Sequence, residues 1–306
     1  MDDNTAIATL GEEERQLLVG LRDRNPEAVA ALVDRSYPAL LLLAGQAGGR
    51  GPRLVEEAWR DVMEHNVADE PLEDLRLRIR AVVLQRARTA EGAGAEPSPV
   101  AAVPPACFET SESHWPGWWK EAAAERAASG ALHDEWPDEG SEIWDHLAEA
   151  IRRLPLGERV VVVLRHIEGW SPEEVEELVG LSPSRLRSRL HAARSRLHHA
   201  LDQAGADASA ADTLVGTSPP SRTPRSPDYD FSCEEMVEMT TEFLEGGQTP
   251  RERAFFEQHL LVCEPCLAHL HRLRATTALL RGLPQAIGPA PEDLRQSVLA
   301  RLAAVG

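Results

Sequence analysis

The chain has 306 residues and carries 32 Lys and Arg against 50 Asp and Glu, which gives a formal net charge of −18. This length predicts about two domains, and no apolar run approaches the roughly 18 residues that a membrane helix needs. The acidic opening MDDNTAIATLGEEERQ lacks the basic and apolar regions of a secretory signal, so we expect a soluble, cytoplasmic protein without membrane contact.

Apolar residues recur with helical spacing along most of the chain, whereas the alternating runs typical of strands are scarce. We therefore predict an all-α protein. The helical spacing occurs in residues 12–45, 52–66, 72–90, 143–200, 233–246, 250–282 and 291–304.

Changes in composition mark the domain boundaries. Residues 91–106 and 202–228 are rich in Ala, Gly, Ser and Pro and lack apolar periodicity, which is typical of linkers. The predicted order is a helical domain at 10–90, an acidic linker containing Pro and Trp at 91–140, a helix-turn-helix domain at 141–201, a flexible linker at 202–228, a small domain at 229–283 and a C-terminal amphipathic helix at 284–306.

Residues 143–201 contain two consecutive helix-start signals separated by a short turn. Ser171 precedes Pro172 and Glu174, and Ser182 precedes Pro183 after a break at Gly180; this pattern predicts a helix-turn-helix. The second helix has one apolar side and one polar side that is rich in Arg, as a helix that enters the DNA major groove requires. A merely structural helical hairpin is the alternative. The residues predicted to contact DNA are Ser184, Arg185, Arg187, Ser188 and His191.

This stretch resembles the −35-reading domain of extracytoplasmic-function sigma factors, the small specificity subunits of bacterial RNA polymerase. The resemblance covers about fifty residues and implies promoter DNA and core RNA polymerase as partners. The spacer 114–119 (HWPGWW) is similar to a Trp-rich spacer in one actinobacterial branch of that family. The residues that carry the main resemblance are Leu154-Pro155, Glu158-Arg159, the run Val160 to Leu164, Glu168-Gly169-Trp170 and the Arg-rich helix.

The helices expected in 12–90 follow the order of the sigma-factor domain that grips the polymerase clamp and opens the −10 element. Two motifs depart from that family. Pro52-Arg53 stands where an acidic pair is usual, and the polar residues of the promoter-melting helix are replaced within 80–86. A plain helical bundle is therefore an alternative for this segment. The basic residues that could meet phosphates are Arg76, Arg78, Arg80, Arg86 and Arg88.

Cys233, His259, Cys263 and Cys266 form the pattern C-x25-H-x3-C-x2-C. His259 and Cys263 are four residues apart, so a helix would place them on one face. Three sulfurs and one imidazole complete a structural zinc site and leave no position for a catalytic water. His269 and His271 are alternates that we expect on a solvated helix face, and Cys107 is expected to be a lone thiol in the linker.

The surroundings of these ligands resemble the zinc-binding anti-sigma domain, a helical module that binds a sigma factor and keeps it from polymerase. The resemblance spans about 229–283 and implies an intramolecular contact between sigma-like and anti-sigma-like parts. A tether of about 27 residues gives roughly millimolar effective concentration, which favours autoinhibition. Oxidation of Cys233 with Cys263 or Cys266 is a further hypothesis, because a disulfide would expel zinc. The residues that carry this resemblance are Cys233-Glu234-Glu235, 241–246, Glu252-Arg253 and the stretch from Phe256 through His259 to Cys266.

The sequence thus predicts a transcription regulator, a sigma-factor-like protein autoinhibited by a fused zinc domain. One alternative is a sigma-derived DNA- or partner-binding regulator that no longer initiates transcription, and another is a zinc anti-sigma module acting in trans. An enzyme is not expected, because the sequence has no phosphate loop and no nucleophile elbow.

Overall fold

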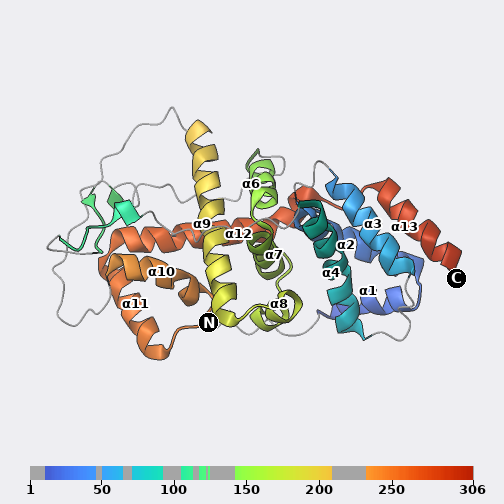
Figure 1. Ribbon diagram of the computed structural model, residues 1–306, viewed down its shortest axis with the longest axis horizontal. Helices are drawn as coiled ribbons and strands as arrows, with labels where there is room; N and C mark the ends of the chain where they lie inside the picture. Colours follow the sequence, from blue (N-terminus) through green and yellow to red (C-terminus); the bar gives the residue numbers. More distant parts are fainter. Residues whose placement is uncertain are drawn as a thin grey trace. The chain divides into compact units, whose positions relative to one another are not determined.

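The computed structural model is helical in every regular element of the residues that it describes, with one isolated antiparallel bridge between Phe108 and Trp119 (Figure 1). The all-α prediction is confirmed. None of the described helices is long and apolar enough to cross a membrane. Residues 92–104, 113–116, 125–141 and 209–231, which include most of both expected linkers and Trp115 of the Trp-rich spacer, lie outside the described residues. The described residues are 11–45, 50–64, 71–91, 105–112, 117–121, 123–124, 142–208 and 232–305.

The chain divides into two compact units. Unit 1 contains Met1–Pro97, Glu139–Leu186 and Leu280–Gly306, and unit 2 contains Ser98–Asp138 and Arg187–Leu279. The boundary between the two units falls inside two long helices, α9 and α12, so each of these helices contributes residues to both units.

Unit 1 begins with four helices, and the start of the second follows a local sequence signal. Asn25 caps the second helix by accepting hydrogen bonds from the backbone N–H groups of Glu27 and Ala28 at 2.9 and 3.1 Å, with Pro26 at the first helical position. Apolar side chains of all four helices are buried, among them Leu18, Leu40 and Trp59. The helices are α1 (Glu12–Arg22), α2 (Pro26–Ala44), α3 (Gly51–Glu64) and α4 (Leu72–Glu91).

The C-terminal helix α13 (Glu292–Val305) packs on α2 and α3 (Figure 1). Its predicted apolar side is buried there, with Leu294, Val298 and Leu302 each at most 9% exposed. Polar contacts flank this face: Arg295 pairs with Asp34 at 2.7 Å, Ser297 donates to Glu56 at 2.9 Å, and Arg301 pairs with Glu64 at 3.2 Å. The surface of α2 and α3 that α13 covers therefore has a partner within its own chain.

The helix-turn-helix region has the local structure that its sequence predicts. Ser171 and Glu174 form a reciprocal capping box at the start of α8, and Gly180 ends that helix in the left-handed conformation with φ of 69°. The β-branched run at 160–164 is helical and continues into a π-helical turn. The elements are α6 (Glu142–Arg153), α7 (Leu156–Val162), the π turn Val163–Ile167, α8 (Pro172–Val179) and α9 (Pro183–Ala208).

A cluster of buried charges joins α4 to the helix-turn-helix. Arg80 pairs with Glu168 at 3.0 Å, and Arg76 pairs with Glu174 at 2.5 Å while its guanidinium lies 4.1 Å from the ring centroid of Trp170. Burial lowers the pKa of Arg80, but the carboxylates of Glu168 and Glu14 outweigh burial and raise the pKa above its usual value.

Both arginines also pair with Glu14 of α1, at 3.3 and 3.4 Å. In this structure Arg76 and Arg80, which were predicted to be available for phosphates, are at most 7% exposed and engage carboxylates instead. The helical spacing of residues in the sequence could not predict these ion pairs, because the acidic partners lie up to 98 residues away along the chain.

Unit 2 contains three helices that meet near the predicted zinc ligands. Capping boxes start the first two, one formed by Ser232 and Glu235 and the other by Thr249 and Glu252. Behind them, the rings of Phe243 and Phe256 stack at 4.4 Å between centroids. The helices are α10 (Cys233–Leu244), α11 (Pro250–Val262) and α12 (Glu264–Ile287).

The buried charge cluster generates a prediction about stability. Replacing Arg80 by Ala leaves Glu168, whose side chain is 8% exposed, without a guanidinium partner. We expect this change to lower the free energy of unfolding by about 3–5 kcal/mol, measured by urea titration followed by circular dichroism.

The matched control removes an arginine from an exposed ion pair. Arg53, whose side chain is 76% exposed, pairs with Glu57 within α3, so Arg53→Ala is expected to change stability by less than about 1 kcal/mol. Equal losses for the two variants would show that burial of the Arg80 cluster contributes nothing.

Candidate metal centre and nucleic-acid interface

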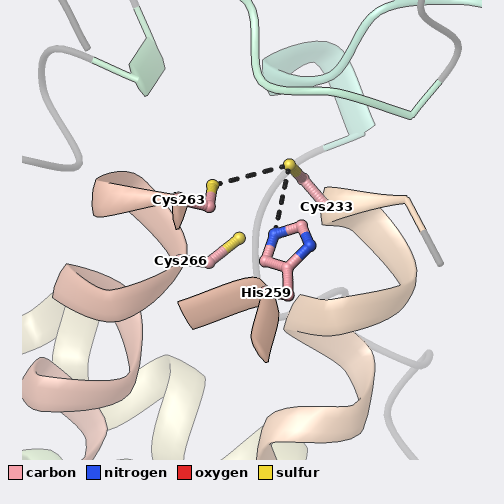
Figure 2. A group of neighbouring side chains, drawn as sticks. All are labelled: Cys233, His259, Cys263 and Cys266. Atoms are coloured by element: carbon pink, nitrogen blue, oxygen red, sulfur yellow. Dashed lines mark hydrogen bonds between the residues drawn. The ribbon is translucent and has the colours of Figure 1, made fainter. Parts of the chain in front are cut away.

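The structure brings the four predicted zinc ligands together from three helices. Cys233 is the first residue of α10, His259 lies in the last turn of α11, Cys263 ends α11, and Cys266 lies in the first turn of α12 (Figure 2). The backbone N–H of Cys263 donates to the carbonyl of His259 at 2.9 Å, and its extended conformation turns the chain into α12. All four ligand atoms lie within 4.8 Å of one another and all four residues are buried.

The distances between the ligand atoms fit a tetrahedral zinc ion. Zinc bonds of about 2.3 Å to sulfur and about 2.0 Å to nitrogen separate two sulfurs by about 3.8 Å and a sulfur from a nitrogen by about 3.5 Å. Cys233 Sγ lies 3.8 Å from Cys263 Sγ and 3.7 Å from Nε2 of His259. Three soft thiolates and one imidazole form a donor set that binds zinc in preference to harder cations.

The thiol pKa values show why this cluster suits a cation. A hydrogen bond from Cys233 is the main cause that lowers the pKa of Cys263, whereas burial is the main cause that raises the pKa of Cys266. Without a metal charge, three buried thiols so close together cannot all ionise. A bound divalent cation supplies the charge that keeps all three as thiolates.

The cluster is enclosed by apolar side chains of unit 2, with Met236, Phe256 and Leu270 each 1% exposed. Four protein ligands in a water-excluding environment are typical of a structural zinc, since a catalytic zinc keeps one position for water. The chain therefore contains a zinc site of the structural kind.

His269 corrects one expectation from the sequence. It is 3% exposed rather than solvated, and burial, together with the nearby His198 and His191, lowers its pKa to about 3. It is thus neutral at physiological pH. The physical reason is that this side of α12 faces α9 instead of water, whereas His271 remains half-buried. Neither histidine belongs to the four-residue metal cluster.

The five residues predicted to contact DNA divide into two groups. Ser184, Arg185 and Ser188 are exposed. Arg187 lies 3.8 Å from the carboxylate of Glu242, and His191 forms a 3.2 Å hydrogen bond with the hydroxyl of Thr241. Burial, followed by the charge of Arg194, lowers the pKa of His191, which favours its neutral form in this contact.

A buried ion pair lies one turn further along α9. Arg194 pairs with Glu245 immediately after α10, and their side chains are 1% and 8% exposed. The sequence did not single out either residue for this role, although Arg194 was recognised as part of the basic helix. Side chains of α9 thus contact the same short stretch of unit 2 that begins at Thr241.

Two family models match parts of the chain. The model described as "Sigma-70, region 4" matches residues 145–197, and the model described as "Putative zinc-finger" matches residues 233–267. The first contains α7, α8 and the Arg-rich part of α9, and the second contains all four residues of the metal cluster. The sigma-like and zinc-finger parts predicted from the sequence are thereby confirmed.

Curated relatives are sigma factors. The chain is 34% identical over 98 residues to the RNA polymerase sigma-E factor of Streptomyces avermitilis, covering 30% of this chain and 54% of that protein. It is 33% identical over 84 residues to the RNA polymerase sigma factor CarQ of Myxococcus xanthus, covering 27% of this chain and 48% of that protein. The chain thus spans about half the length of the curated relatives that it matches. No solved structure gave a significant match.

The metal centre generates a prediction about zinc content. We expect the purified protein to hold one zinc, and Cys266→Ala to lose it, because three remaining ligands cannot close the tetrahedron. Elemental analysis after dialysis measures both. Cys107→Ala is the matched control, since this half-buried thiol lies outside the four-residue cluster; retention of zinc by Cys266→Ala would exclude that ligand.

Proposed function

We propose that this chain is a non-enzymatic transcription regulator of the sigma-factor type, whose zinc domain masks its own DNA-reading helix. The observation that carries the proposal is the contact between α9 and the stretch 241–245. Two of the five predicted DNA contacts, Arg187 and His191, face this stretch. A guanidinium paired with a carboxylate must break that pair before it can bind a phosphate or a base edge.

The pair between Arg194 and Glu245 strengthens this argument. Both side chains are almost fully buried. Separating them would therefore either expose the two charges to solvent or leave them buried apart from each other. Removing one partner of such a pair typically costs about 3–5 kcal/mol. The contact therefore favours a closed form in which the zinc domain competes with DNA for the same helix.

The proposed partners are promoter DNA and core RNA polymerase, so the proposed place of action is the cytoplasm. The match to region 4 and the names of the relatives support this assignment. The exposed Ser184, Arg185 and Ser188 are proposed to read the −35 element together with Arg187 and His191 once the helix is released. The zinc held by Cys233, His259, Cys263 and Cys266 is proposed to be structural and to fix the position of α10.

The masking hypothesis is tested with the full chain by removing charge from the contact. The double variant Glu242→Gln, Glu245→Gln removes the two carboxylates that pair with Arg187 and Arg194, which favours release of α9. We expect promoter-duplex affinity to rise roughly tenfold or more, which corresponds to at least about 1.4 kcal/mol. Fluorescence anisotropy with a labelled duplex measures it.

The matched control has the same change of net charge at an exposed position of the same helix. Glu238→Lys replaces one negative charge by one positive charge at an exposed position, so it raises the net charge by two, as the double variant does by removing two carboxylates. An equal rise in DNA affinity for both variants would mean that net charge rather than masking governs binding.

A specific observation supports a second candidate, a sigma-derived regulator that binds DNA or a partner without initiating transcription. Arg76 and Arg80 of the helix that resembles the melting element are buried in ion pairs, and α13 covers α2 and α3. Transcription by core polymerase with the released double variant separates the two functions. Transcripts from a defined promoter support a sigma factor, whereas DNA binding without transcripts supports the second candidate.

A redox response is a further proposal about the same site. The sulfurs of Cys233 and Cys263 lie 3.8 Å apart, so a small approach would allow a disulfide. Peroxide would accept two electrons from the two thiolates and leave as water, and zinc would be released. In the Cys107→Ala background we expect peroxide to release zinc and to raise DNA affinity; zinc retention at high peroxide would refute the redox switch.

A further inference from the structure

Residues 105–112 and 117–121 form two short paired segments within unit 2, which together are called the hairpin. Phe108 and Trp119 pair as an antiparallel bridge, and the backbone N–H of Lys120 donates to the carbonyl of Cys107 at 2.8 Å. The rings of Phe108 and Trp119 lie 4.8 Å apart between centroids. This part of the expected linker is therefore an ordered structure with its own hydrogen bonds.

The hairpin places Trp119 against the metal cluster. The indole N–H of Trp119 donates to Sγ of Cys266 at 3.3 Å, and the Trp119 side chain is 7% exposed. The backbone of Trp119 also hydrogen-bonds Cys233. The ring of Trp118 lies 6.2 Å from that of His259. One residue of the linker thus reaches two of the three sulfurs.

A second contact fixes the hairpin to the start of α10. The backbone N–H of Glu234, which has no partner within its helix, donates to the carbonyl of Gly117 at 2.9 Å. Gly117 has φ of +73°, and a Cβ at this position would lie 2.8 Å from the Cβ and Oγ of Ser232. Only glycine allows both this backbone conformation and this close approach.

We propose that Trp119 is an outer-shell residue of the zinc centre, and that zinc binding and docking of the hairpin segments 105–112 and 117–121 stabilise each other. An N–H donor to a zinc-bound thiolate delocalises its negative charge and fixes the sulfur's orientation. The Phe108 ring and the bridge hold the indole in place for this role. The two family models that match residues 145–197 and 233–267 do not include these segments.

The coupling has a direct consequence for the linker. Because binding free energies are reciprocal, any stabilisation of zinc by the hairpin equals the stabilisation of the hairpin by zinc. Loss of zinc therefore releases a segment that connects the two parts of the chain resembling a sigma factor. This coupling involves the metal centre alone and does not depend on DNA binding.

The first experiment removes the indole donor and keeps an aromatic ring. We expect Trp119→Phe to weaken zinc binding about 10–100-fold, measured by competition with a chromophoric chelator. Trp144→Phe is the control, because Trp144 lies in α6 of unit 1 and should leave zinc affinity unchanged. Zinc affinity of Trp119→Phe within twofold of wild type would overturn the outer-shell role.

The second experiment displaces the hairpin without touching an aromatic residue. Gly117→Ala should weaken zinc binding because the new methyl group meets Ser232. Gly169→Ala is the matched control, since Gly169 has the same φ of +73° but no atom within 4 Å of the position that its new Cβ would take. Equal zinc affinity in the two variants would contradict docking of the hairpin.

The third measurement uses the unmutated protein, so it does not depend on how a variant folds. Hydrogen exchange of the backbone amides in 105–121 is followed with zinc bound and after chelation. We expect exchange at Glu109 and Lys120, whose amides donate within the hairpin, to accelerate at least tenfold on zinc removal. Unchanged protection at these amides would refute the coupling.

Discussion

The four predicted zinc ligands lie together where α10, α11 and α12 meet, and the proposed regulation depends on that arrangement. The three helices form a small module, and modules of this size seldom bury enough apolar surface to be stable without a metal or a disulfide. Four ligands at the ends of the helices replace much of the missing core. Because Cys233 is the first residue of α10, the proposed zinc would fix the end of that helix opposite to Thr241 and Glu242. It would thereby position, over the length of one helix, the residues that contact α9.

Several arginines of this acidic chain are paired with carboxylates inside the protein. With a net charge of −18, most of the surface repels DNA, so binding depends on the local basic side of α9. In this structure several arginines are occupied internally: Arg80 by Glu168 and Arg194 by Glu245. A buried guanidinium has little freedom to seek another anion. In the proposed mechanism, arginines that could bind phosphates in the open form would therefore stabilise the closed form through these ion pairs.

Local signals in the sequence predicted much of the fold, and long-range contacts account for what they missed. Capping at Ser171 and the turn at Gly180 depend on neighbouring residues, so the helix-turn-helix could be located from the sequence. The zinc ligands were predicted by spacing because the chemistry of zinc restricts residue types. By contrast, the solvated position expected for His269 was wrong, since burial depends on packing between α12 and α9. Trp119 was recognised only as part of an aromatic spacer, because its contact with Cys266 spans 147 residues.

Covalent linkage determines how strong the contact between α9 and the zinc domain needs to be. The flexible linker predicted from the sequence, about 27 residues long, would give an effective concentration on the order of 1 mM. If the contact has micromolar intrinsic affinity, the closed form would be about a thousand times more populated than the open form. This ratio corresponds to a free-energy difference of about 4 kcal/mol. The cost of breaking one buried ion pair, about 3–5 kcal/mol, is of the same size. In the proposed masking mechanism, a signal that disturbs α10 enough to separate Arg194 from Glu245 would therefore open the chain without any change in α9 itself.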